Sequence, residues 1–276
     1  MMKRSRVVLY AVAWLIGLLW VLPFLGVFVS SVRPFGEVAD GWWQLEEFTL
    51  TLDAFIRAWN HPSAPVGPAL LNSVSIAVPA TILTIVFASL AAYAFARFKF
   101  RLKSPLFFIV ILIMAMPGQS IIIPLYAHMV NLGLWDTRLG LILVHTAWGL
   151  PWAVLFLRNF FLSVPLDLEE SARVYGASDL RIFLRIVMPI ALPAIVSIAV
   201  LQFVWVWNDF IFALIVLSSP DKKVVTQTIP LIKGRYDIPW SVLSAASVLS
   251  MIVPLLIFVF LQRYYVKGVL AGAIKG

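Results

Sequence analysis

The stretch VVLYAVAWLIGLLWVLPFLGVFVSSV, residues 7–32, contains no charged side chain. An α-helix needs about 20 mostly apolar residues to cross a hydrocarbon core of about 30 Å, so this stretch predicts a membrane-spanning helix. The basic residues 1–6 precede it, as they do in a signal peptide. The stretch is longer than the usual apolar region of about 7–15 residues, however, and no small-residue cleavage site follows it. We therefore expect a retained anchor.

Five further apolar stretches are long enough to span a membrane. They are residues 68–96, 104–126, 139–157, 186–219 and 238–262. The stretch 186–219 contains a single acid, Asp209. Together, the six stretches predict an all-α polytopic membrane protein that forms one transmembrane domain, residues 1–276.

The composition excludes the other broad classes of protein. Of the 276 residues, 62% are hydrophobic and 12% are charged, and the mean hydropathy is +0.98. A soluble domain has about 25% charged residues, so neither a soluble fold nor disorder fits. The chain has no cysteine, which excludes disulfides, Cys-ligated zinc and thiol catalysis.

The basic residues predict the orientation in the membrane. Fourteen of the 21 Lys and Arg residues lie in the N-terminus, residues 97–103, residues 158–185 and the C-terminus, and the other seven lie in the alternate connections. Because basic residues concentrate in cytoplasmic loops, we expect both termini inside. The net charge of +8 then faces anionic lipid headgroups, and a nucleic-acid partner is not needed to explain it.

One cytoplasmic connection, residues 158–189, has the pattern of two short helices. Ser163-Val164-Pro165 is a helix start signal, and Gly176 lies where a left-handed residue would end that helix. Ser178-Asp179 then begins a second helix. The two helices form either a docking element or an interfacial segment that lies on the bilayer.

The spacing of this loop resembles a known motif. The loop contains Glu170-Ser171-Ala172, then Gly176 after three further residues, and then Ile186-Val187-Met188-Pro189 after nine more. This pattern is similar to the EAA loop of binding-protein-dependent ABC importer permeases. The resemblance implies the six-helix type I permease fold, with the loop docking on a cytoplasmic ATPase. The coupling residues carried over by position are Glu170, Ser171, Ala172, Tyr175, Gly176, Ile186 and Pro189. Tyr175 replaces an aspartate that many relatives have, which alters any charge-mediated contact there.

Other segments resemble the carbohydrate-uptake branch of this family, in particular the second permease of maltose-type systems. They are residues 31–34, 71–73, 91–98, 207–210 and the tail 262–276. In close relatives the tail reaches between the two ATPase subunits. The resemblance therefore implies that the cytoplasmic tail 263–276 contacts the ATPase through Gly272, Lys275 and Gly276.

Polar and aromatic residues within the spans are candidates for a substrate pathway, because such groups are costly in a membrane. We assign this role to Asn72, Gln119, Trp148, Trp205, Asn208 and Asp209. Amides, an acid and aromatic rings suit the hydroxyls and ring faces of a sugar. The alternative is hydrogen bonding between helices, worth about 0.6 kcal/mol per contact. We expect His145 to be a packing residue.

No enzymatic motif is present. The chain lacks H-E-x-x-H and G-x-x-x-x-G-K-[ST], which excludes a zincin and an ATPase of the P-loop type. Gly118-Gln119-Ser120 resembles part of an intramembrane serine-protease motif, but Ile121 follows instead of glycine. We therefore predict no catalytic, metal or cofactor site on this chain, with ATP and Mg on a partner.

The resemblance predicts a sugar-importer permease in the cytoplasmic (inner) membrane of a prokaryote. Its expected partners are a second, homologous permease, two ATPase subunits, an extracytoplasmic sugar-binding protein and membrane lipid, without nucleic acid. Two alternatives stay open: a permease for a non-sugar solute and a stand-alone secondary carrier. Carriers commonly use internal repeats and several intramembrane charges, whereas Asp209 is the only acid within the expected spans and we find no repeat.

Overall fold

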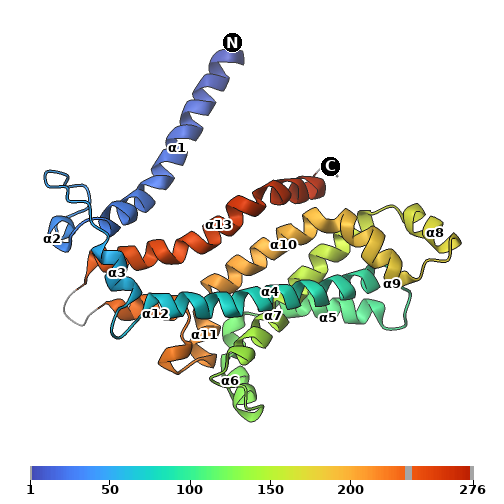
Figure 1. Cartoon of the computed structure of the whole chain (residues 1–276). Helices are drawn as coiled ribbons and strands as arrows, with labels where there is room; N and C mark the ends of the chain where they lie inside the picture. Colours follow the sequence, from blue (N-terminus) through green and yellow to red (C-terminus); the bar gives the residue numbers. More distant parts are fainter. Residues whose placement is uncertain (1, 234–237, 274–276) are drawn as a thin grey trace. The chain divides into compact units, whose positions relative to one another are not determined.

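The computed structural model describes the backbone of residues 2–233 and 238–273 and the side chains of residues 7–233 and 238–262. Within these ranges every regular element is helical (Figure 1), which confirms the all-α expectation. The elements are α1 (Met2–Ser31), α2 (Phe35–Val38), α3 (Asp53–Trp59), α4 (Val66–Arg97), α5 (Lys103–Ala115), η1 (Gly118–Ile121), α6 (Ile122–Asn131), α7 (Arg138–Ser163), α8 (Leu166–Val174), α9 (Asp179–Ile182), η2 (Phe183–Val187), α10 (Met188–Asn208), α11 (Ile211–Val216), η3 (Pro220–Lys222), α12 (Val225–Ile232) and α13 (Trp240–Ala273).

The chain forms two compact units. Unit 1 consists of residues 1–70 and 227–253, and unit 2 consists of residues 71–226 and 254–276. Unit 2 contains the expected coupling loop and all of the expected substrate-pathway residues. The expectation of one transmembrane domain stays a prediction.

Five helices are long and apolar enough to cross a membrane. They are Val7–Ser31, Val66–Arg97, Arg138–Ser163, Asp179–Asn208 and Trp240–Gln262. The expected span at 104–126 falls instead on two helices, Lys103–Ala115 and Gly118–Asn131, with a bend of 98° between them. Pro117 causes this break, because it lacks an N–H and holds the preceding Met116 in an extended conformation. The described part of the chain thus has five candidate spans, or six if the bent pair counts as one.

The expected span at 186–219 was wrong at both ends. The helix begins earlier, at Asp179, and it ends at Asn208. Asp209 is extended, with ψ of 133°, and its carboxylate accepts the N–H groups of Phe212 and Ala213 at 3.4 and 3.0 Å. This side chain caps the separate short helix α11. Asp209 therefore lies at a break between helices and not inside a continuous span.

A π-helical turn, η2, precedes Pro189, which lies in the first turn of α10. Proline cannot donate a hydrogen bond to the carbonyl four residues earlier, here that of Arg185. An irregular turn is the usual response of a helix to such a gap. The second short helix expected in the coupling loop therefore runs directly into the following span.

Small residues form the centre of unit 2. Ala92 on α4, Ala153 on α7 and Ala191 on α10 are completely buried, and they belong to one apolar cluster. Small side chains let helix backbones approach closely, which is a main source of stability between helices in lipid. The same cluster includes Phe161 and Phe183, so it extends to the end of the unit that holds the coupling loop.

A buried arginine organises the loop after α1 in unit 1. The side chain of Arg33 is 1% exposed and pairs with Glu37 at 3.1 Å. Its guanidinium also donates to the carbonyls of Trp42 at 3.3 Å and Glu47 at 2.5 Å, and it lies over the ring of Phe48. The hydrogen bonds of this one side chain thus reach segments up to 14 residues away.

Glu37 completes this network. The backbone N–H of Thr49 donates to its carboxylate at 3.0 Å, and this bond, together with Arg33, holds the pKa of the Glu37 carboxyl below its usual range. The N–H of Thr51 donates to the carbonyl of Val32 at 2.8 Å. The segment 33–51 is therefore ordered by polar contacts more than by apolar burial.

We predict that Arg33→Met loosens this segment, because the carboxylate of Glu37 and two backbone carbonyls each lose the guanidinium as a donor. Breaking a buried ion pair costs about 3–5 kcal/mol, and hydrogen exchange at the amides of Thr49 and Thr51 should accelerate accordingly. The matched control is Arg57→Met, since Arg57 forms an equivalent i,i+4 pair with Asp53 that is 61% and 64% exposed and worth about 0.5 kcal/mol. Equal acceleration in both variants would contradict the role of Arg33.

Candidate functional site

In the expected coupling loop, the first helix ends as the sequence predicts. Helix α8 ends in a Schellman motif: Gly176 N–H donates to the carbonyl of Arg173 at 2.9 Å, and Ala177 N–H donates to that of Ala172 at 3.0 Å. Gly176 has a φ of +77°, a left-handed conformation that favours glycine. Nothing lies within 4 Å of the position a Cβ would take there. The glycine is therefore required by the backbone turn and not by crowding.

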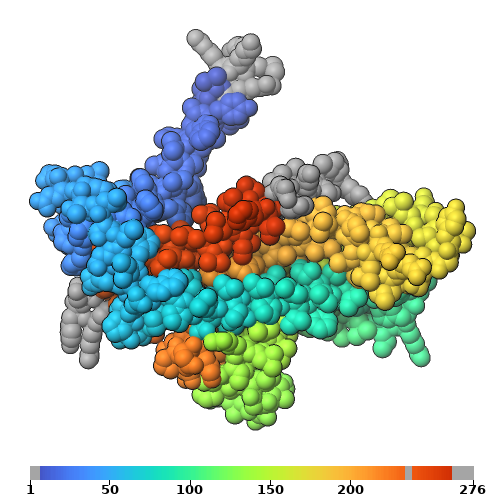
Figure 2. All heavy atoms as spheres, viewed as in Figure 1, coloured from blue at the N-terminus to red at the C-terminus, as the bar shows by residue number. Residues whose placement is uncertain are grey.

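The loop has an inner and an outer side. Ala172 and Ile186 are half-buried and pack against the apolar cluster of unit 2. The remaining expected coupling residues are exposed: Glu170, Ser171, Tyr175, Gly176 and Pro189. Figure 2 shows the loop, coloured yellow, as the surface at one end of unit 2.

Large apolar side chains on the loop's outer side are unusually exposed. Val174 is 86% exposed and Tyr175 is 89% exposed. Leu180 and Leu184 are also exposed. Contiguous apolar patches on a surface usually mark an interaction site. The Schellman turn thus presents an apolar tip beside the exposed carboxylate of Glu170.

A buried polar cluster that the sequence analysis missed holds the loop on unit 2. Glu169 is completely buried; its carboxylate lies 2.6 Å from Arg97 Nε and accepts the hydroxyl of Tyr93 at 2.9 Å. Arg97 also donates to the carbonyl of Val164 at 2.8 Å. The available signal was that Tyr93 and Arg97 are four residues apart, and so share one face of α4.

The turn is closed from outside by a second ion pair. Arg173 donates from Nε and Nη2 to Asp179 Oδ1 at 3.2 and 3.1 Å. The hydrogen bond to Asp179 raises the pKa of Arg173 further above its usual value. The pair joins α8 to α9 across Gly176. Because Arg173 is 40% and Asp179 is 53% exposed, we assign it a minor energetic role.

Three tryptophans line a pocket of about 140 Å³ in unit 2. Its walls are Trp148, Trp152 and Trp205, together with Ile113, Met114 and Pro151. The structure therefore brings together two of the expected pathway residues, Trp148 and Trp205. Trp152 was missed because its neighbourhood in the sequence, Leu-Pro-Trp-Ala, shows no polar signal.

Gln202 fixes the orientation of Trp152. The indole N–H of Trp152 donates to Gln202 Oε1 at 3.1 Å, and Gln202 Nε2 donates to the carbonyl of His145 at 3.3 Å. Gln202 is 1% exposed. It lies against Gly149, where a Cβ would come within 2.4 Å of Gln202 Nε2. Glycine at this position thus makes room for the amide.

The other expected pathway residues do not line this pocket. Gln119 is exposed on η1, next to Gly118, whose Cβ position would be 3.3 Å from Trp148. Asn208 is exposed and donates to the carbonyl of Val204 on its own helix at 2.8 Å. Asp209 caps α11 and lies 3.6 Å from Nε2 of His145. Trp148 is in ring contact with Phe212 of the same α11.

Asn72 is buried and occupied by backbone contacts. Its side-chain nitrogen donates to the carbonyls of Asp221 at 2.8 Å and Lys223 at 2.9 Å. The neighbouring Ser73 hydroxyl accepts the N–H of Val225 at 2.9 Å. These bonds fasten one part of α4 to residues 221–225. The alternative role for such residues was hydrogen bonding between helices. Asn72 has a similar structural role, but it bonds to the backbone of a loop and not to another helix.

Asp136 holds the adjoining residues 218–222 in place, and we call these contacts the Asp136 latch. It accepts the N–H groups of Ser218 and Ser219 at 2.9 and 3.0 Å, and Lys222 Nζ lies 3.0 Å away. Partial burial opposes its ionisation, but the bonds from Ser219, Ser218 and Lys222 prevail and hold the pKa of the Asp136 carboxyl well below its usual range. Its φ of 56° places it in the left-handed region that aspartate tolerates better than most residues.

We predict that acid releases this latch. A carboxylate whose pKa is depressed by folding contributes stability above its unfolded pKa of about 3.9, and this contribution is lost as the pH falls toward the folded value. Amide protection factors at Ser218 and Ser219 should therefore be high at pH 7 and decline below about pH 4. Asp136→Asn should remove about 2–3 kcal/mol of local stability at pH 7. The control is the exposed Asp221→Asn, and an equal effect there would argue against the latch.

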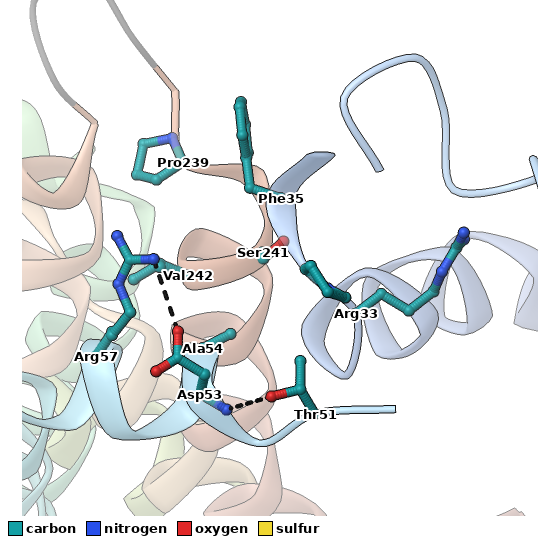
Figure 3. A pocket seen from close by; sticks show the side chains of 10 residues that line it. Arg33, Phe35, Thr51, Asp53, Ala54, Arg57, Pro239, Ser241 and Val242 are labelled. Atoms are coloured by element: carbon teal, nitrogen blue, oxygen red, sulfur yellow. Dashed lines mark hydrogen bonds and ion pairs between the residues drawn. The ribbon is translucent and has the colours of Figure 1, made fainter. Parts of the chain in front are cut away.

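Unit 1 has a pocket of about 150 Å³ near Arg33 (Figure 3). Thr51 accepts the N–H of Asp53 at 3.1 Å, and Arg57 pairs with Asp53 at 3.7 Å. Ser241 on α13 also lines the pocket. Its buried hydroxyl has no hydrogen-bond partner among the described residues. The pocket combines a free hydroxyl with an exposed ion pair.

The expected tail contacts fall largely outside the described residues. Lys275 and Gly276 are not described, and Gly272 lies in the part of α13 of which only the backbone is described. Among the described side chains, no group of three or more His, Asp or Glu residues is arranged to hold a metal ion.

Residues 84–270 match the family model described as "Binding-protein-dependent transport system inner membrane component". A probable ABC transporter permease protein of Pyrococcus horikoshii is 47% identical, with 99% of each chain covered. The trehalose/maltose transport system permease protein MalG of Thermococcus litoralis is 33% identical, covering 99% of this chain and 98% of that protein. A chain of a bacterial ABC transporter involved in alginate import shares the fold, with a TM-score of 0.82, 22% identity, and 95% and 97% coverage.

Proposed function

We propose, because this chain belongs to the family of binding-protein-dependent transport system inner membrane components, that it is the permease subunit of an ATP-driven ABC importer for a sugar. The trehalose/maltose relative, similar over nearly its whole length, supports the substrate class. The single observation that carries the proposal is the coupling loop: α8 presents the exposed Glu170 and the apolar tip around Gly176, while its inner side is fastened to unit 2.

The proposed membrane arrangement has six spans, in which the bent pair Lys103–Ala115 and Gly118–Asn131 acts as one broken span. Both termini and the coupling loop lie in the cytoplasm of a prokaryotic cell. The excess of Lys and Arg in these segments supports this orientation. Broken helices are tolerated at membrane depth where they line a cavity or are buried in protein, which fits a translocation path.

The proposed assembly contains a second permease, two ATPase subunits and an extracytoplasmic binding protein. ATP and Mg would bind only the ATPase chains. Closure of the ATPases would displace the coupling loops, and the two permeases would alternate between outward and inward access. Such coupling requires that ATP and sugar both bias one two-state element.

The tryptophan pocket is the proposed contact with sugar on this chain. Aromatic faces stack on the apolar faces of sugar rings, and indole N–H groups donate hydrogen bonds. Trp148 lies beside the break at Pro117-Gly118, so a change in that bend would alter the pocket. Gln119, Asn208 and Asp209 remain proposed pathway residues at the neighbouring breaks.

We predict that Gly176→Trp uncouples ATP hydrolysis from uptake, because a bulky side chain would fill the ATPase-facing side of the turn. The matched control is Gly133→Trp: Gly133 also has a positive φ, of 66°, and open space around its Cβ position, but it lies between α6 and α7. Sugar uptake per ATP in proteoliposomes should fall about tenfold or more for Gly176→Trp and change little for Gly133→Trp.

Assembly of each variant is checked by co-purification with the ATPase and the second permease. An assembled Gly176→Trp complex with normal uptake would refute the docking role of the loop. Normal uptake by this chain alone, driven by an ion gradient, would instead identify a secondary carrier.

We predict that Trp148→Leu and Trp205→Leu lower the maximal uptake rate, since each removes an aromatic wall while the leucine preserves apolar packing. Loss of one stacking contact of about 0.5–1.5 kcal/mol corresponds to a decrease of about 2–10-fold. Trp20→Leu, at an exposed position on α1, serves as the control. Unchanged kinetics in both pocket variants would place the sugar contacts elsewhere, and uptake of a non-sugar solute alone would correct the substrate class.

A further inference from the structure

The buried cluster of Glu169, Arg97 and Tyr93 has a geometry that apolar packing alone does not require. The side chains of Glu169 and Arg97 are 0% and 4% exposed. A buried carboxylate is costly unless it is paired and hydrogen-bonded. Both oxygens of Glu169 meet this condition, one with Arg97 and the other with the hydroxyl of Tyr93.

The cluster fixes the coupling helix at more than one point. Arg97 bonds both to the carboxylate of Glu169, within α8, and to the carbonyl of Val164, before α8 begins. The ring of Tyr93 also packs against Phe183 of the π-helical turn, with ring centroids 4.9 Å apart. Side chains at the end of α4 thus hold both helical segments of the coupling loop.

The opposite part of α4 is fastened as well. Asn72 and Ser73 bond to the backbone of residues 221–225. From Asn72 to Arg97 the helix is continuous, with Pro79 in its interior, and its length is about 37 Å at a rise of 1.5 Å per residue. One helix, α4, therefore connects the coupling loop to residues 221–225, next to the residues that Asp136 binds.

We propose that Glu169, Arg97 and Tyr93 are positioning residues that make α8 move together with α4, so that displacement of the coupling loop reaches residues 221–225 through a single helix. The inference rests on the proposed function for the source of the displacement. An apolar contact such as that of Ala172 can slide with little loss. If α8 shifts, Glu169 keeps Arg173 of its own helix at 3.7 Å, but the buried guanidinium of Arg97 loses its carboxylate. This cost makes the contact between α4 and α8 stiff.

The absence of cysteine allows a direct test. Leu168→Cys, at a 46% exposed position of α8 outside the apolar tip, introduces one site for a nitroxide label, and the label's mobility is measured in the assembled importer. Glu169→Gln keeps the side-chain volume but removes the charge opposite Arg97. Asp167→Asn removes an exposed acid from the same helix and is the matched control.

In Glu169→Gln the label should become several-fold more mobile, and sugar transported per ATP hydrolysed should fall about fivefold or more. Both quantities should stay unchanged in Asp167→Asn. Tyr93→Phe, which preserves the ring packing and the ion pair, should give a smaller change in the same direction. A purely structural role would lower the yield of assembled complex without altering mobility or stoichiometry in the complex that does assemble.

An assembled Glu169→Gln complex with unchanged label mobility and unchanged stoichiometry would overturn the inference. If the Glu169→Gln variant fails to assemble, the Tyr93→Phe variant is measured in its place. Unchanged label mobility and unchanged stoichiometry in Tyr93→Phe would then overturn the inference. The two proposals fail separately. A wild-type complex that imports no sugar refutes the function, whereas the mobility of the label still reports whether Glu169 holds α8.

Discussion

Every backbone N–H and C=O group within a hydrocarbon core must find its partner inside the protein, because no water is available there. This constraint explains why the described residues form helices and why the few interruptions matter. At Asp209 a carboxylate takes over the free amides of α11. At Asp136 a carboxylate binds two amides of a connecting loop. Two of the chain's few acidic residues, Asp209 and Asp136, thus accept backbone N–H groups where the helical hydrogen bonds stop.

Charged side chains also order one loop in each unit. In unit 1, Arg33 gathers acceptors from a segment with little apolar burial. In unit 2, Arg97 and Glu169 join two helices at the end of an alanine-rich core. Beyond the core, apolar packing no longer holds the loops in one conformation. An ion pair with all its hydrogen bonds made can do so, because its hydrogen bonds require a defined geometry. In each unit, a hydrogen-bonded charged side chain thus gives a loop its defined shape.

The sequence was a good guide to features that depend on local patterns. Apolar length located the five candidate spans, with errors at their ends. Gly176 correctly predicted the end of α8, because a left-handed turn has a strong local preference for glycine. The failures were also physical. A hydropathy pattern does not detect Pro117 bending a span by 98° or Asp209 dividing another. Glu169 looks like any surface acid beside Glu170, and only the tertiary contact with Arg97, 72 residues away, reveals it as buried. Trp152 and Gln202 likewise acquire their roles through a contact across 50 residues.

The contact between Gly149 and Gln202 has a consequence for how such a pocket can diversify. The orientation of Trp152 is set by an amide that lies behind the pocket wall, and the space for that amide exists because residue 149 has no side chain. A methyl group added there would displace the amide to which the indole is bonded, so the width of the pocket would change while every residue that lines it stayed the same. The shape of this pocket therefore depends on residues that do not line it.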